Sequence, residues 1–385
     1  MSSTFLSSYL HEVTSSLSNW YTDNYDFYRF GPQPQRSWKT LIADYLGRRG
    51  YLLGDAYSDG VMAAVQLVEA YLAHFEWLYN QLADDESREI LIKVMAFRAL
   101  GHRRVKLPLN TPTYWDELKL MERLANPSDF IPLSFLNWQL YRMDLNAVGV
   151  PMQLYSTPMG AHHQFVLEQY RCRSHGGDIA AEPSDYVIDA GACWGDTALY
   201  FAYRSKPDGR VFSYEFIPDN LEIMRRNLAL NPDLSNRIQV IERAAWDKSN
   251  LTISVQGEGP GSSVCVGETG APDAGPLTLA IDDLVRQQNL PIVDFIKMDI
   301  EGAELPALRG AMQTIQRHKP KLAISVYHRL TDFFEIPEFL DSLGCGYRYF
   351  LQHSTIHAEE TVLFAKANPR CRGKVIPIQV ATTDS

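Results

Sequence analysis

Apolar residues recur at three- and four-residue spacing in the first part of the chain. One such stripe spans residues 58–82, and a second spans residues 85–100. This spacing is typical of helices that bury one face. Strand-like runs follow between residues 140 and 169. We therefore expect residues 1–175 to form a mainly helical N-terminal domain that covers the substrate or mediates oligomerisation.

A regular alternation of strand-like and helix-like segments begins near residue 185. It predicts an α/β fold with a mostly parallel sheet and helices on both faces. The last two strands have no helix between them, so we expect them to pair antiparallel at one edge. We also expect a short pair between residues 251–255 and 277–280. The main strands are expected at 186–190, 211–216, 238–243, 295–299, 322–327, 347–352 and 361–365.

Length and composition are compatible with two domains in a chain of 385 residues. We place the α/β domain at 176–367 and a tail at 368–385. No apolar run is long enough to cross a membrane, and residues 1–20 lack the pattern of a signal peptide. The five cysteines are scattered without a CxxC pair, which favours reduced thiols and the cytoplasm.

Charge favours a small-molecule substrate. The chain carries a net charge of −10 and has no long basic stripe. Proteins that bind nucleic acids usually present such a stripe to the phosphates. We therefore expect neither a nucleic-acid partner nor a membrane partner, and we leave a homo-oligomer open.

A glycine-containing loop follows the first strand of the α/β domain. The strand ends at Asp189, Gly191 allows close approach of a ligand, and Gly195 opens the next helix ahead of Thr197. The loop lacks the paired glycines that bind a pyrophosphate, which argues against a dinucleotide-dependent oxidoreductase. An acid at Asp189 suits a cationic group instead, such as the ammonium of S-adenosylmethionine (SAM).

Two further positions fit the nucleoside half of such a ligand. Glu215 ends the next strand about 20 residues past Gly195, where an acid accepts hydrogen bonds from ribose hydroxyls. The third strand ends in small residues, and Ala245 leaves room for a flat adenine. We therefore expect Asp189, Gly191, Gly195, Thr197, Glu215, Ala245 and Asp299 to contact the cofactor.

Three acids lie just after a central strand, in the segment Asp299-Ile300-Glu301-Gly302-Ala303-Glu304. Buried carboxylates without partners are costly, so these acids must be solvated, paired or functional. Glu304 also suits the start of a helix. We therefore regard Asp299 and Glu301 as the functional candidates.

These segments resemble the FkbM family of SAM-dependent methyltransferases. The resemblance is carried by Asp-Ala-Gly at 189–191, Gly-Asp-Thr at 195–197, residues 296–304, residues 324–328 and residues 360–365. It implies the Rossmann-like seven-stranded sheet of class I methyltransferases. It also implies methyl transfer from SAM to a hydroxyl of a polyketide-like natural product or a sugar. The bulky Cys193-Trp194 pair in the glycine loop departs from what we expect of the family.

Chemistry at an aliphatic hydroxyl requires a group that accepts its proton. His328 follows a strand that ends at the same sheet edge, and we predict it as the base, with an ordinary pKa near 6.5. Asp299 is predicted to orient it, and Glu301 is a further candidate base. Two alternatives stay open. One is a divalent-metal-dependent O-methyltransferase with Asp299, Glu301 and His328 as ligands, which we do not favour. The other is a catalytically silent SAM-fold binding module.

Overall fold

The core of the α/β region is a seven-stranded sheet in the order β15-β16-β14-β13-β6-β7-β8. The computed structural model describes residues 4–31, 42, 45–47, 49, 56–174, 177–256, 263–266 and 275–367. The predicted tail at 368–385 lies outside these residues. The strands of the sheet are β6 (Tyr186–Ala190), β7 (Arg210–Tyr214), β8 (Ile238–Ile241), β13 (Phe295–Met298), β14 (Lys321–Ser325), β15 (Tyr347–His353) and β16 (Thr361–Ala367).

Strand directions confirm the predicted topology. Strands β14, β13, β6, β7 and β8 are parallel, and β16 is antiparallel to both β14 and β15. Parallel strands bring their carboxyl ends to one edge, where ligands of doubly wound sheets bind. Helices cover both faces: α9 (Asp196–Arg204), α10 (Pro218–Ala229), α11 (Pro232–Ser235), α12 (Ile281–Gln287), α13 (Glu304–Arg309), α14 (Met312–His318) and α15 (Asp332–Ser342).

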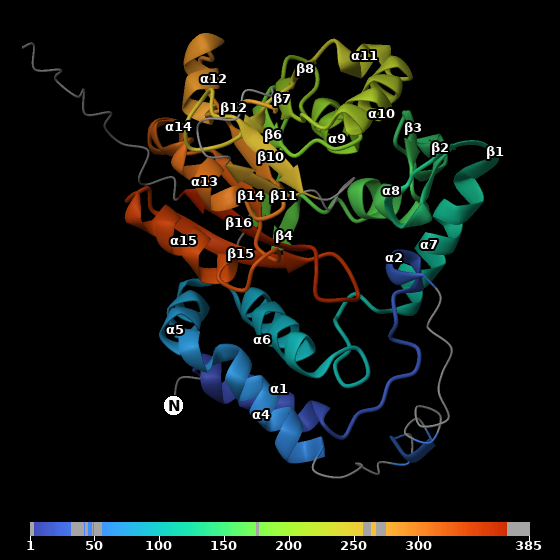
Figure 1. Cartoon of the computed structure of the whole chain (residues 1–385), viewed down its shortest axis with the longest axis vertical. Coiled ribbons are helices and arrows are strands. Elements are labelled where there is room, and N and C mark those ends of the chain that lie inside the picture. Colours follow the sequence, from blue (N-terminus) through green and yellow to red (C-terminus); the bar gives the residue numbers. More distant parts are fainter. Residues whose placement is uncertain are drawn as a thin grey trace, which may run out of the picture.

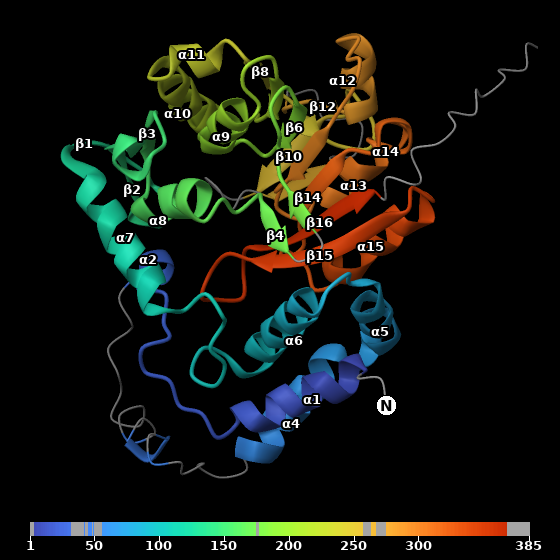
Figure 2. The same ribbon diagram turned by 180° about the vertical axis from the view of Figure 1, so that it is seen from behind.

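Helices α5 (Leu72–Gln81) and α6 (Asp85–Leu100) lie beside α15 and β15, and α1 (Phe5–Ser16) and α4 (Ala56–Val68) lie on their far side, as both views show (Figures 1 and 2). The 3-10 turn η1 (Glu69–Tyr71) joins α4 to α5, whereas the short helix α2 (Phe27–Phe30) lies apart from them, beside α7 (Pro112–Leu124). Asp84 caps α6, because its side chain accepts a hydrogen bond from the backbone N–H of Ser87, and Gly101 ends the helix. Phe75 and Leu78 on the inner face of α5 belong to the same buried hydrophobic cluster as the sheet.

The outer edge of β15 is covered by the turn between α5 and α6. Ala83 donates its backbone N–H to the carbonyl of Tyr349, and the N–H of Leu351 donates to the hydroxyl of Ser87. An exposed edge strand would present unpaired backbone groups, and these bonds satisfy two of them in the middle of β15. The N-terminal helices therefore complete the sheet edge.

A small antiparallel sheet follows α7 (Pro112–Leu124). It consists of β1 (Ala125–Pro132), β2 (Gln139–Asp144) and β3 (Gln153–Ser156), with η2 (Phe135–Asn137) and η3 (Leu145–Val148) between them. Strand β3 is held against α10 and the start of α11. The side chains of Asn227 in α10 and of Asn231, which precedes α11, form hydrogen bonds with the backbone of Tyr155 and Gln153, respectively. The chain then enters α8 (Pro158–Ala161), the π-helical turn η4 (His162–Val166) and the pair β4 (Cys172–Ser174) and β5 (Gly177–Ile179).

Two local predictions need correction. The stripe at 58–82 is divided between α4 and α5 by the 3-10 turn η1. Helices α13 and α14 are likewise separated at Gly310. At Gly310 a side chain would meet the Trp246 carbonyl at 2.1 Å, so the close contact explains the glycine. The predicted pair between 251–255 and 277–280 is also wrong beyond one isolated bridge. Instead, β10 (Ile253–Gln256) pairs with β11 (Ser263–Val266), and β12 (Thr278–Leu279) pairs with β9 (Ala244–Ala245).

No helix among the described residues combines the length and apolar character needed to cross a bilayer.

Candidate active site

The glycine loop lies between β6 and α9 at the carboxyl edge of the sheet. Gly191 has φ +86°, and a Cβ at this position would lie 1.9 Å from the carbonyl oxygen of Asp299. Gly195, at φ +81°, caps α9, and a Cβ there would press on Met224. Both positions therefore require glycine, for backbone conformation and for space.

Asp189 lies beneath this loop and is fully buried. Its Oδ1 is 3.2 Å from Nζ of Lys297, and its Oδ2 accepts hydrogen bonds from the hydroxyls of Thr197 and Ser213. Lys297 also donates to the carbonyl of Gly191 at 2.6 Å. The Asp189 carboxylate therefore already has internal partners. Its predicted contact with a cofactor ammonium, and that of Thr197, stay predictions.

Lys297 is a residue that our sequence analysis did not assign. It is 1% exposed and occupies the third position of the buried strand β13. A charged residue inside an apolar strand needs a buried partner of opposite charge. The sequence signal for this buried ion pair is a lysine within an otherwise apolar strand. Its partner, Asp189, lies on the neighbouring strand.

Glu215 follows β7 directly and is buried. Its carboxylate accepts hydrogen bonds from the backbone N–H groups of Phe216 and Ile217, and from the side-chain amide of Asn220. Burial raises the pKa of Glu215 despite these bonds. Ala245 ends β9 and is also buried. Their predicted contacts with ribose and adenine remain predictions.

A cavity of about 510 Å³ opens at this edge of the sheet. Gly191, Asp196 and Thr197 from the glycine loop and α9 line one part of it. Asp299, Glu301 and His328 line another part. The structure thus brings the glycine loop and the acidic segment, about 100 residues apart in sequence, to one cavity.

Asp196 is a second residue that the sequence analysis left without a role. Burial raises the pKa of its carboxyl to about 6, against the opposing charge of Lys297. It has no ion-pair partner within 4 Å among the described residues. A partly buried carboxylate of this kind suits a cationic ligand group.

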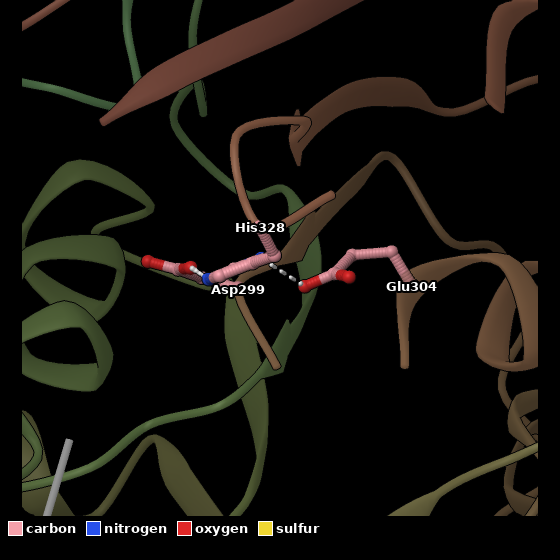
Figure 3. Close-up of side chains that lie close together, drawn as sticks. All are labelled: Asp299, Glu304 and His328. Atoms are coloured by element: carbon pink, nitrogen blue, oxygen red, sulfur yellow. Dashed lines mark ion pairs between the residues drawn. The ribbon is translucent and has the colours of Figure 1, made fainter. Parts of the chain in front are cut away.

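The ring of His328 lies between acids on both sides (Figure 3). Its Nδ1 is 3.1 Å from Oε1 of Glu304, and its Nε2 is 3.5 Å from Oδ1 of Asp299 and 3.4 Å from Oε2 of Glu301. Glu304 is fully buried at the start of α13, and its Oε1 also accepts the backbone N–H of Ile300. This arrangement is that of a histidine held by carboxylates.

These acids decide the charge of His328. Burial alone would lower its pKa, but the close contacts with Glu301 and Glu304 and the charges of Glu304 and Asp299 outweigh burial and raise the pKa to about 11. The contacts thus move the pKa of His328 far above the ordinary value near 6.5, which argues against its predicted role as the base. At neutral pH the ring carries its proton, so it has no free nitrogen to act as a base.

The pKa values of Asp299 and Glu301 are shifted in opposite directions. Burial opposes the charge of Asp299, but Lys297 and His328 outweigh it and lower the pKa of this carboxyl. Tyr170 and Tyr327 also donate their hydroxyls to Asp299, at 2.7 and 3.2 Å. Burial raises the pKa of Glu301, although its contact with His328 opposes that change. Glu301 is therefore the more basic of the two carboxylates.

The cluster also bears on the metal alternative. Single ligand atoms of Asp299, Glu304 and His328 all lie within 4.8 Å of one another. However, Asp299 and Glu304 face opposite ring nitrogens, so one ion bound to a single nitrogen would not reach both acids along with the ring. Asp299 and Glu301, the two acids of our sequence-based alternative, both lie on the Nε2 side of the ring, at 3.5 and 3.4 Å.

Comparisons with known proteins agree with this architecture. Residues 189–349 match the methyltransferase FkbM domain. The methyltransferase sdnD of Sordaria araneosa is 28% identical over 178 residues, an alignment that covers 38% of this chain and 68% of that protein. The crystal structure of methyltransferase FkbM from Methylobacillus flagellatus KT superposes with a TM-score of 0.52 at 21% identity. It covers 86% of this chain and 72% of its own, and at this identity it supports the fold alone.

The glycine loop, the acidic segment and the sheet order all lie within or beside the matched region. Residues 189–349 of the chain therefore form a region that matches the methyltransferase FkbM domain.

Proposed function

We propose that this protein transfers a methyl group from SAM to a hydroxyl of a small molecule. The observation that carries the proposal is that one cavity is lined both by the glycine loop and by Asp299, Glu301 and His328. A methyl donor seated on the loop would face the acids. Catalysis of this transfer depends strongly on holding the acceptor oxygen in line with the methyl group.

The residues present suit the donor. SAM supplies a methyl group on a positively charged sulfur. Asp196 and Asp299 both line the cavity and offer carboxylates to a cationic ligand. Glu215, which directly follows the neighbouring strand β7, would accept hydrogen bonds from the ribose hydroxyls. We assign the ammonium of the donor to Asp196 in place of the internally paired Asp189.

Glu301 is our proposed general base. The hydroxyl oxygen forms its bond to the methyl carbon as the bond from that carbon to sulfur breaks, and the hydroxyl proton passes to the carboxylate of Glu301. The raised pKa makes Glu301 a better proton acceptor than Asp299. His328, held as a cation, fixes the positions of Glu301 and Asp299. The total charge of the site does not change in this step, because the hydroxyl proton remains on Glu301, beside the imidazolium of His328.

The acceptor is proposed to be a polyketide-like compound or a sugar. The N-terminal half of the chain contributes Phe30, Trp138, Met159 and Gln164 to the cavity wall and therefore selects the acceptor. Cys172, Cys193 and Cys345 are free thiols, which supports the cytoplasm as the compartment.

A binding titration combined with a transfer assay tests the proposal. Calorimetry should detect SAM and S-adenosylhomocysteine (SAH), and Glu215→Ala should weaken both by about 1–3 kcal/mol. Methyl-labelled SAM should pass its label to a member of a panel of hydroxylated polyketides and sugars. SAM binding without transfer to any acceptor would favour the silent binding module. Preferential binding of NAD would contradict the proposal.

A further inference from the structure

The acceptor side of the cavity has an apolar wall. Phe30, Phe135, Trp138 and Met159 come from the N-terminal half, and Trp194 comes from the glycine loop. A second hollow of about 230 Å³ shares Trp138 and Met159 with this wall and extends it. Such a surface suits a ligand with an apolar ring face, because aromatic side chains bury large flat areas.

Trp194 also explains how this wall is held. It packs in one cluster with Leu140 of β2 and Ile223 of α10, with Trp138 at the margin of the same cluster. Asn227 of α10 donates to the Trp194 carbonyl at 2.9 Å and to the Tyr155 carbonyl of β3 at 3.1 Å. These contacts hold the apolar wall against the glycine loop. Trp194, the bulky residue of that loop, therefore has a packing role.

The turn η4 presents an unsatisfied polar group at the same cavity. Gln164 lines the cavity and is 3% exposed, and its side-chain nitrogen has no hydrogen-bond partner among the described residues. A buried donor without a partner costs about 1–3 kcal/mol. An oxygen of a bound ligand would remove that cost. Single π-helical turns of this kind occur frequently at functional sites.

The charges of the cavity wall restrict the ligand further. Among the described residues, five carboxylates line the cavity: Asp196, Asp299, Glu301, Glu359 and Glu360. Three cationic side chains line it, and each pairs with an acid already: Arg29 with Glu359 and Glu360, Lys297 with Asp189, and His328 with Glu301 and Glu304. His163 also lines the cavity, but burial holds its pKa well below the usual value, so this ring is neutral. No unpaired cation on the described wall is therefore available to a carboxylate or phosphate of the acceptor, and the surplus of acids would repel it.

We propose that the acceptor is a neutral or amine-bearing hydroxyl compound with an apolar ring face, and that Gln164 donates a hydrogen bond to a second oxygen of that compound. The inference rests on the proposed function for the location of the acceptor. It narrows the substrate class to compounds that carry no carboxylate or phosphate near the reacting hydroxyl. The carboxylates repel such an anion, and Gln164 recognises the oxygen.

Three matched probes test this directly in the full-length protein saturated with SAH. Phenyl β-D-glucoside is neutral, the corresponding glucosaminide is cationic, and the corresponding glucuronide is anionic. Their dissociation constants, measured by calorimetry or ligand-observed NMR, should show the first two binding at least tenfold more tightly than the glucuronide. Glu301→Gln should reduce that ratio. Glu222→Gln, which removes the same charge from the exposed face of α10, should leave it unchanged.

Gln164 is tested with two variants. Gln164→Met keeps the size of the side chain and removes the donor, so it should weaken the neutral probe about tenfold while the affinity for SAH stays normal. Gln164→Glu should shift preference toward the amine-bearing probe. Normal SAH affinity verifies that each variant is folded.

Several outcomes would overturn the inference. They are tighter binding of the glucuronide, unchanged affinity of the neutral probe in Gln164→Met, or no binding of any probe. Transfer of labelled methyl groups is read separately. The expected order of binding without any methyl transfer would count against the proposed reaction and in favour of the inferred ligand class.

Discussion

The ammonium of Lys297 lies 3.2 Å from the carboxylate of Asp189, and both side chains are buried beneath the glycine loop. Lys297 also donates to the carbonyls of Ala190 and Gly191, so the pair connects two neighbouring strands to the loop that they support. The charge of Asp189 attracts Lys297 strongly enough to outweigh burial, and the pKa of Lys297 is raised. The pair therefore fixes the loop from below, and the cavity above it remains free for a ligand.

Removal of one partner should destabilise the fold. Lys297→Met would leave the buried Asp189 charge uncompensated, and we expect the free energy of unfolding to fall by about 3–5 kcal/mol. The double variant Asp189→Asn with Lys297→Met should lose much less than the sum of the two single variants. Denaturant unfolding measures all three. Additive losses would show that the two groups are not coupled.

Glu301→Gln should lower turnover by about 100-fold, because the amide cannot accept the hydroxyl proton. The affinity for SAH should remain normal, since this side chain faces the acceptor. The measurement is the rate of methyl transfer to the best acceptor in the panel, with Glu335→Gln as a control that removes the same charge elsewhere. Near-normal turnover in Glu301→Gln would exclude this residue as the base.

Cofactor affinity should depend on pH through Asp196. Its pKa of about 6 in the free protein means that the carboxyl loses its proton as pH rises through that value. Only the charged form attracts the ammonium of SAH, so affinity should be about tenfold higher at pH 7 than at pH 5. Calorimetry at several pH values measures this change. Asp196→Asn should remove it.

5′-Methylthioadenosine provides the control for this pH dependence. It has the same nucleoside but lacks the ammonium, so its affinity should not follow Asp196. It still contacts the ribose site, and any effect of Glu215, whose pKa is also raised, would appear with both ligands. A parallel change for the two ligands would therefore assign the titration to Glu215.

Chelation should leave methyl transfer intact. The imidazolium of His328 already compensates Asp299 and Glu301, and Glu304 lies on the other ring nitrogen. We expect dialysis against EDTA to change turnover by less than about twofold, a range that would exclude a metal as a Lewis acid for the hydroxyl. Loss of activity that magnesium or manganese restores would instead support the metal-dependent alternative.

Much of the fold could be predicted from local pattern. Buried strands and amphipathic helices are coded by neighbouring residues, so the alternation after residue 185 predicted the strands, their directions and the antiparallel edge. The glycine loop could also be predicted from the sequence, because Gly191 and Gly195 adopt backbone conformations that other residues rarely tolerate. The acidic segment at 299–304 stood out because charges beside a buried strand require partners.

What the tertiary structure decided is the state of those groups. The sequence shows that His328 lies near the end of a strand, but its pKa depends on Glu301 and Glu304, which reach the ring only after α13 packs beside β14. In the same way, the identity of Asp189 is local information, whereas its pairing with Lys297 depends on the register of β6 against β13. The cavity wall from the N-terminal half likewise depends on long-range packing. Electrostatic energies depend on distances in space and on burial, and neither quantity is contained in local sequence spacing.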